Sequence, residues 1–214
     1  MVKSGMPSPV GHVIGGIATA WAADLLPGHR SGRTAPPTAS FSRRSGGALT
    51  LLCAGLAALP DMDLVSSVHR TVTHSLTATA IVTIVAIVVT GWVTPKSNPY
   101  PQRRPHIGAL RVGLMCGAAY ASHLFLDWLA VDRNPPAGIQ LLWPFNSRWF
   151  ISGVDVFPQT ERREFFSWPS IATNVKAIAW EAATMLPILA ALWLIRVKAL
   201  ARLATELSRG DHAP

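Results

Sequence analysis

The sequence predicts an all-α integral membrane protein with about five transmembrane or membrane-embedded helices. Half of its 214 residues are hydrophobic and only 14% are charged, whereas about a quarter of the residues in an ordinary soluble domain are charged. The mean hydropathy is +0.31. From His74 to Thr94 the chain has no Lys, Arg, Asp or Glu, and that run is long enough to cross a hydrocarbon core of about 30 Å.

The chain consists of five apolar segments separated by polar connections, which predicts a single membrane-embedded domain, residues 1–214. The segments are Val10 to Leu26, Ala48 to Leu59, His74 to Thr94, Ile107 to Val131 and Val175 to Val197. The second is short for a full span, so it is tilted, re-entrant or extended by Gly46-Gly47. The main connections are an Arg-rich loop at 27–47, a loop at 95–105, an aromatic-rich loop at 132–174 and a basic tail at 198–214.

The first segment has features of a secretory signal peptide, because Lys3 precedes it and Ala20-Trp21-Ala22 resembles a cleavage site. A His and three glycines interrupt its apolar run, however, and cleavage would export the Arg-rich loop that follows. We therefore expect this segment to be retained.

If all five segments cross the bilayer, their polar groups meet at one membrane face. These groups are His12, Asp61, Asp63, His74, His123, Asp127 and Glu181. The loops at 27–47 and 95–111 and the tail from Arg196, with Asp24 counted beside them, carry 12 of the 19 Lys and Arg but 3 of the 11 acids. Basic loops stay cytoplasmic, so we expect a multi-pass inner-membrane protein with its polar cluster at the extracytoplasmic face. The aromatic loop falls on that face and could act as a lid.

The net charge of +8 does not indicate nucleic-acid binding. The basic residues lie in short loops between apolar runs, with no basic helix face and no aromatic stacking pattern, so membrane topology explains them. The expected partner is the lipid bilayer, and no protein partner is indicated. Cys53 and Cys116 both fall inside apolar runs, which predicts small core residues without a disulfide.

Polar residues in the apolar segments suggest a metal site. Asp61, Asp63, His69 and His74 lie within fourteen residues of one another, at a membrane boundary where such groups are costly unless they pair or bind something. His123 and Asp127 are spaced i and i+4, so they share one helical face. A single such His is usually a core residue and a single Asp a helix cap. The hypothesis depends on five segments bringing His or carboxylate to one level.

A mixed nitrogen and oxygen set suits Zn, Mn or Fe better than Ca, and it lacks the thiolates of a structural zinc site. The candidates exceed the needs of one tetrahedral ion. They predict either two ions about 3.5–4 Å apart or some residues that orient the imidazoles from behind. A water in an open coordination position would become a nucleophile. Glu181, or an aspartate that does not bind metal such as Asp63, would then be the general base.

Several motifs together resemble the YdjM-like family of inner-membrane-associated, predicted metal-dependent hydrolases. They are Gly11-His12, Leu59-Pro60-Asp61-Met62-Asp63, His69-Arg70-Thr71-Val72-Thr73-His74-Ser75, His123-Leu124-Phe125-Leu126-Asp127 and Leu141-Leu142-Trp143-Pro144-Phe145. The resemblance covers about residues 8 to 150. It implies metal-site roles for His12, Asp61, Asp63, His69, His74, His123 and Asp127. It also implies a distant similarity to zinc-dependent phospholipase C-type enzymes, which is an analogy of fold.

Three functions follow from these observations. The first is a membrane-bound hydrolase that uses one or two divalent ions, with Zn preferred over Mn or Fe, to cleave a lipid or lipid-linked phosphoester. The second is a metal transporter or sensor, because His and Asp clusters inside membranes also mark ion pathways. The third is a non-catalytic membrane protein whose polar groups hold helices together by hydrogen bonds.

Overall fold

The computed structural model describes residues 7–23, 25, 46–65, 70–93, 108–133, 135–161, 164 and 166–210. Within these ranges the chain forms five α-helices and one 3₁₀ helix, with no β-strand. The helices are α1 (Pro9–Ala23), α3 (Gly47–Ala58), η2 (Leu59–Val65), α4 (Leu76–Val93), α5 (Ala109–Leu129) and α6 (Trp168–Gly210). The predicted all-α fold is confirmed for the described residues.

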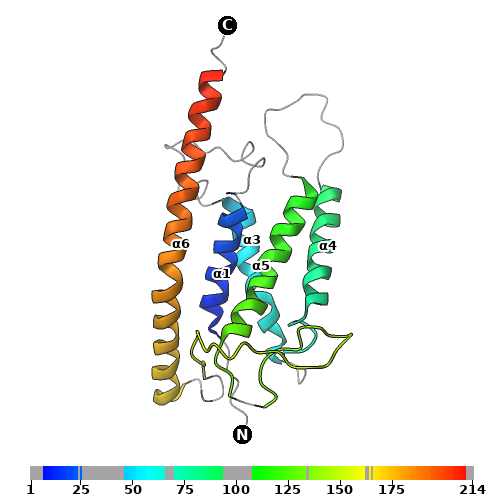
Figure 1. The fold of residues 1–214 in the computed structure, drawn as a ribbon, viewed down its shortest axis with the longest axis vertical. Coiled ribbons are helices and arrows are strands. Elements are labelled where there is room, and N and C mark those ends of the chain that lie inside the picture. The colour runs from blue at the N-terminus through cyan, green and yellow to red at the C-terminus, as the bar shows by residue number, and fades with distance from the viewer. Residues whose placement is uncertain are drawn as a thin grey trace.

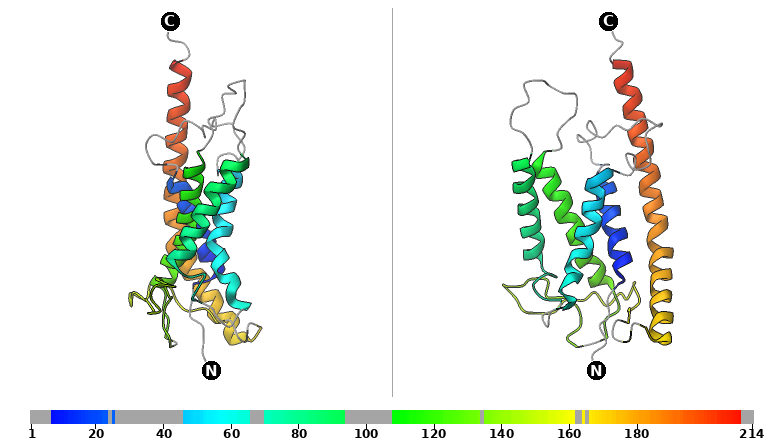
Figure 2. Two further views of the ribbon diagram at one scale, coloured as in Figure 1. Left: turned by 90° about the vertical axis from the view of Figure 1, so that its right-hand side faces the viewer. Right: turned by 180° about the vertical axis from the view of Figure 1, so that it is seen from behind.

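The five α-helices alternate in direction along the chain (Figure 1). Helix α5 packs against α4, α1 and α3, whereas α6 packs on the far side of α1. Seen from behind, α3 lies across the face formed by α1 and α5 (Figure 2). This alternation brings the start of α1, η2, the start of α4, the end of α5 and the first part of α6 to the same end of the bundle, as the apolar pattern predicts.

Three helices are long and apolar enough to cross a membrane, namely α4, α5 and the part of α6 from Trp168 to Ala199. No residue of α4 is fully buried, so beyond its contact with α5 this strongly apolar helix presents much of its surface outward. Such a surface is favourable in lipid and costly in water. With 15 and 12 residues, α1 and α3 are shorter than a usual span, and their full crossing stays a prediction.

Close helix contacts depend on small residues. An ideal Cβ atom at Gly16 of α1 would lie 2.5 Å from the backbone oxygen of Cys53 in α3. At Gly113 of α5 it would lie 2.9 Å from the backbone oxygen of Thr83 in α4. Both distances are too short for any side chain, so glycine is what allows these helix backbones to approach. Cys53 and Cys116 are both buried, which confirms the prediction that they are core residues.

The last helix differs most from its predicted range. It begins at Trp168 instead of Val175 and continues past Val197 to Gly210, so part of the predicted basic tail is helical. Ser167 stands directly before the helix, and its hydroxyl accepts a hydrogen bond from the Ser170 N–H at 3.4 Å, which satisfies one of the helix's unpaired N–H groups. The aromatic connection that was predicted as 132–174 therefore ends about seven residues earlier.

Candidate metal centre

The 3₁₀ helix η2 begins where Pro60 interrupts α3. Proline has no N–H to continue the α-helical pattern, and the Leu59 N–H instead bonds to the Leu56 oxygen, three residues back. The tighter winding turns the side chain of Asp61 into the bundle, where the residue is only 7% exposed. The break in the helix thus places a carboxylate beside α5.

His123 and Asp127 both point into the bundle from the last turns of α5, and both are buried. The ring nitrogen Nδ1 of His123 lies 2.7 Å from the backbone oxygen of Ala57. A carbonyl oxygen only accepts hydrogen bonds, so Nδ1 carries the proton. In the neutral ring the other nitrogen, Nε2, therefore presents a lone pair to the interior.

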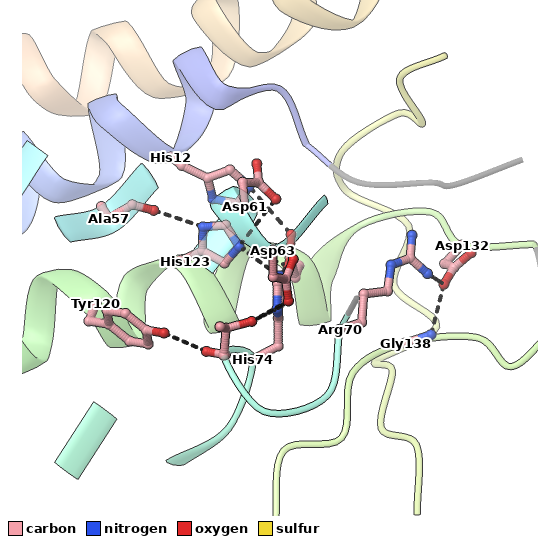
Figure 3. Close-up of polar contacts among 12 residues, drawn as sticks. His12, Ala57, Asp61, Asp63, Arg70, His74, Tyr120, His123, Asp132 and Gly138 are labelled. Atoms are coloured by element: carbon pink, nitrogen blue, oxygen red, sulfur yellow. Dashed lines mark hydrogen bonds and ion pairs between the residues drawn. The ribbon is translucent and has the colours of Figure 1, made fainter. Parts of the chain in front are cut away.

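His74 lies in the turn before α4 and is completely buried. Its Nδ1 atom lies 2.9 Å from the hydroxyl oxygen of Thr73 and 3.5 Å from Oδ2 of Asp63. The Thr73 hydroxyl donates its own proton to Asp63, so its oxygen is free to accept one from His74. Tyr120 of α5 donates a hydrogen bond of 2.6 Å to the Thr73 backbone oxygen and fixes this turn (Figure 3).

Three donor atoms from two segments meet at one point. His74 Nε2 and His123 Nε2 are 3.1 Å apart, and Oδ2 of Asp127 lies 3.3 Å from the first and 3.2 Å from the second. Ligands bound at about 2.0–2.1 Å around a tetrahedral Zn²⁺ lie about 3.3–3.4 Å apart. The three edges of this triangle therefore match the spacing of atoms that share one ion.

A second group of donors adjoins the first. His12 of α1 stacks on His123, with ring centroids 3.6 Å apart and an interplanar angle of 19°. Its Nε2 atom lies 3.4 Å from Oδ1 of Asp127, and Oδ1 of Asp61 lies 3.8 Å from His123 Nε2. His12, Asp61 and His123 each offer one atom within 4.8 Å of the others. The two oxygens of Asp127 thus face different imidazoles.

The hydrogen bonding of this cluster is incomplete among the described residues. Neither ring nitrogen of His12 and neither carboxylate oxygen of Asp127 has a hydrogen-bond partner there, although all four atoms are buried. Buried polar atoms of this kind cost free energy unless a cation or a proton satisfies them. The residues present therefore fit a bound metal ion.

Burial by itself lowers the pKa of His74, but the nearby carboxylates of Asp127 and Asp63 outweigh burial and raise the pKa from 6.5 to about 9. The carboxylates thus hold a positive charge at this imidazole. A proton supplies it at neutral pH in the metal-free protein, and a divalent ion would compete with that proton for Nε2.

The remaining predicted site residues have other positions. Asp63 contacts the far nitrogen of His74, so in this geometry it orients the ring from behind the triangle. Glu181 of α6 accepts hydrogen bonds from the backbone N–H of Ser8 at 2.7 Å and from its hydroxyl, at the start of α1. Its role as general base stays a prediction. His69 lies outside the described residues.

Two residues of this region were not singled out from the sequence. Thr73 and Tyr120 hold His74 through the contacts above. The position of Thr73 directly before His74 is the sequence feature that could have indicated its role. Arg70, within the predicted motif, pairs with Asp132, and Asp132 also accepts a hydrogen bond of 2.8 Å from the Gly138 N–H. This pair fastens the turn before α4 to the connection after α5 (Figure 3).

The predicted lid connects α5 to α6 and lies across the site end of the bundle (Figure 1). Its backbone is fixed to the neighbouring elements by hydrogen bonds from Leu76 N–H to the Leu141 oxygen at 2.9 Å and from Gln140 N–H to the Arg70 oxygen at 3.1 Å. Further on, Val131 N–H bonds to the Phe157 oxygen at 2.9 Å. These contacts make the connection part of the folded bundle.

Comparison with protein families gives a match to the family described as YdjM inner membrane protein, over residues 6–202. Comparison with curated proteins and with solved structures gives no match.

Proposed function

Because the chain belongs to the YdjM inner membrane protein family, we propose that it is a membrane-bound hydrolase whose buried His/Asp cluster binds one or two divalent metal ions. Its substrate is a lipid or lipid-linked phosphoester, and its site faces the extracytoplasmic side. The triangle of His74 Nε2, His123 Nε2 and the Asp127 carboxylate carries the proposal, with edges of 3.1–3.3 Å. Zn²⁺ suits these ligands best, although Mn²⁺ and Fe²⁺ also take imidazole and carboxylate.

Each residue has a separate part in this proposal. His74, His123 and Asp127 hold the first ion, and His12 with Asp61 can hold a second, with the two oxygens of Asp127 divided between them. Asp63 and Thr73 keep the His74 ring in the orientation and tautomer that binding requires. When bound, the metal polarises the ester and lowers the pKa of a coordinated water. Glu181 or Asp63 is the proposed acceptor of its proton.

Elemental analysis of the purified protein, before and after chelation, tests the metal. We expect one or two equivalents of a transition metal that chelator removes and that added Zn²⁺ restores. His74→Ala should lose the metal while the protein stays folded. His106→Ala provides a matched control, because the sequence predicts that His106 lies in a loop of the opposite face. A His74→Ala protein with full metal content would remove the main support for the proposal.

The hydrolase activity needs its own test. Purified protein in vesicles should release phosphate or a headgroup from a set of lipid phosphoesters, and the release should stop with chelator and with Asp127→Asn. A protein that binds zinc but instead carries it into metal-free vesicles would be a transporter. The elements that carry the donors, namely the start of α1, η2, the start of α4 and the end of α5, meet at one end of the bundle (Figure 1). This favours hydrolysis, since an ion pathway needs polar groups through the depth of the membrane.

A further inference from the structure

One exposed apolar stripe runs along α3 and continues into η2. It consists of Leu51, Gly55, Leu59 and Met62, spaced by four, four and three residues, all of which are exposed. The spacing keeps them on one face through the change from α-helix to 3₁₀ helix. The opposite face carries the buried residues Cys53, Ala57, Pro60 and Asp61. The stripe therefore ends beside the metal cluster.

Within the cluster, exposure is confined to the two aspartates of η2. The side chains of His12, His74 and His123 are 0% exposed and that of Asp127 is 2% exposed, whereas those of Asp61 and Asp63 are 7% and 10% exposed. The cluster is therefore most accessible from the side of η2. Met62, which is 70% exposed, stands between these two acids.

The surface around this approach is apolar. Leu59 is exposed before Asp61, and Val72 and Leu76 are exposed on the segment that meets η2 through the Thr73–Asp63 hydrogen bond. We call Leu59, Met62 and Val72 the apolar rim. Leu59 and Met62 continue the exposed stripe of α3, and Val72 lies in the turn before α4, which has no buried residue. Large apolar side chains that continue a lipid-facing surface are most stable in lipid.

We infer that the apolar rim is a lateral entrance from the bilayer and that the ligand of this site is an amphiphile. Its anionic oxygen headgroup reaches the His/Asp cluster past Asp61 and Asp63, while its hydrocarbon chain stays against Leu59 and Met62. The claim about the headgroup rests on the proposed function, because the carboxylates of Asp61 and Asp63 would repel an anion unless a cation lies behind them. The claim that the apolar rim faces lipid depends only on the exposed apolar surface and not on metal binding.

Spin labelling tests whether the rim faces lipid. Met62→Cys is labelled with a nitroxide in phosphatidylcholine–phosphatidylglycerol vesicles, and its collisions with oxygen and with a water-soluble nickel complex are compared. The native thiols are buried, so wild type gives the background. Leu51→Cys serves as the lipid-facing reference and exposed Ser147→Cys as the polar reference. We expect an oxygen-to-nickel ratio at 62 close to that at 51 and several-fold above that at 147. A ratio like that at 147 overturns the inference.

Ligand binding tests the amphiphile. The visible spectrum of the Co²⁺-substituted protein in phosphatidylcholine nanodiscs is titrated with dodecyl phosphate and with ethyl phosphate. Met62→Ser should weaken dodecyl phosphate about tenfold, because it removes apolar contact with the chain, and should leave ethyl phosphate unchanged. Leu51→Ser, farther along the stripe, should change neither. Equal effects on both phosphates, or none, overturn the inference.

The two measurements separate the proposals. If cobalt does not bind, the proposed function fails and the claim about the headgroup fails with it. The nitroxide ratio at position 62 needs no metal and still decides whether the rim faces lipid.

Discussion

The Nε2 atoms of His74 and His123 lie 3.1 Å apart, although 49 positions separate the two residues in the chain. The Nδ1 atom of each ring is used elsewhere, by the Ala57 oxygen for His123 and by Thr73 for His74. Two neutral rings in these tautomers would direct lone pairs at each other and at the Asp127 carboxylate. A positive charge between the two rings, either a proton or a metal ion, removes that repulsion.

Metal binding should release a proton from His74. The pKa of this imidazole is raised to about 9, so it is protonated at pH 7 in the metal-free fold. A divalent ion at Nε2 must displace that proton, and the apparent affinity should therefore rise about tenfold per pH unit below 9 and level off above it. The same raised pKa stabilises the metal-free fold fully below 6.5, and this contribution is lost as the pH rises through 9.

Titration calorimetry in buffers of different ionisation enthalpy measures this release directly. About one proton per ion is expected at pH 7. Asp63→Asn removes one of the carboxylates that raise the pKa of His74, so the metal affinity should level off at a lower pH. A metal affinity that does not change between pH 7 and 9 would contradict the prediction.

Asp63→Asn should also weaken metal binding without abolishing it. Asp63 touches the outer nitrogen of His74 and accepts the Thr73 hydroxyl proton, so its loss loosens the ring but leaves the donor atoms in place. Replacement of such an orienting carboxylate typically costs about 10–100-fold in metal affinity. Competition with a chelating dye measures the change.

Three variants complete this comparison. Asp127→Asn should lose the metal altogether, because its oxygens form one corner of the triangle. Thr73→Val should resemble Asp63→Asn. Asp155→Asn, at an exposed position in the connection after α5, should match wild type. If Asp63→Asn abolished binding as completely as Asp127→Asn does, Asp63 would be a direct ligand.

Gly16→Ala should destabilise the bundle. The added Cβ atom would lie 2.5 Å from the Cys53 backbone oxygen and 2.7 Å from the Ala57 Cβ atom, so α1 and α3 would have to separate. Overpacking of this kind costs about 1–3 kcal/mol, and it should also move His12 away from Asp127. A lower melting temperature in detergent, together with reduced metal content, is the expected result.

Gly55→Ala is the matched control for that variant. It changes the same residue type in the neighbouring helix, where an added Cβ atom meets nothing within 4 Å. Alanine favours helix over glycine by about 1 kcal/mol, so the melting temperature should stay the same or rise. Equal losses in both variants would show that the close approach of α1 and α3 is unimportant.

Glu181→Gln should lower stability and leave the metal content unchanged. The Glu181 carboxylate accepts two hydrogen bonds from Ser8 at the positive end of α1, and hydrogen bonds to a charged group contribute about 1.5–3 kcal/mol. Thermal melting measures the loss, and Ser8→Ala should produce a loss of similar direction. If Glu181→Gln instead melts like wild type and abolishes only the hydrolysis, Glu181 is the general base and not an anchor for α1.

The sequence predicts the helices and their common end well, because lipid imposes a simple rule on them. A charge-free run such as Leu76–Val93 has few alternatives to a helix, and alternation along the chain determines which ends meet. Nothing in the apolar pattern predicts that Pro60 converts the chain to a 3₁₀ helix and so separates Asp61 from Asp63. Asp61 faces His123, whereas Asp63 faces the Nδ1 atom of His74, and these different positions depend on tertiary packing.

The start of α6 was predicted too late for a different reason. The stretch from Ser167 contains a helix-capping Ser, followed by Pro in the first turn, which is an ordinary signal for a helix start. Apolar periodicity misses it because the first turns of α6 are partly polar. Similarly, the role of Tyr120 is hidden in the sequence, since its hydroxyl bonds to a backbone oxygen of another segment.

The Asp127 carboxylate stands between His12, near the beginning of the chain, and His74, in its middle. During synthesis, residues 12 to 74 leave the ribosome before the carboxylate that joins them exists. The nascent chain therefore has no complete set of donors until α5 has been inserted beside α1. If the cluster binds metal as proposed, loading must follow the assembly of these helices, and bound metal would mark a chain whose helices have packed together.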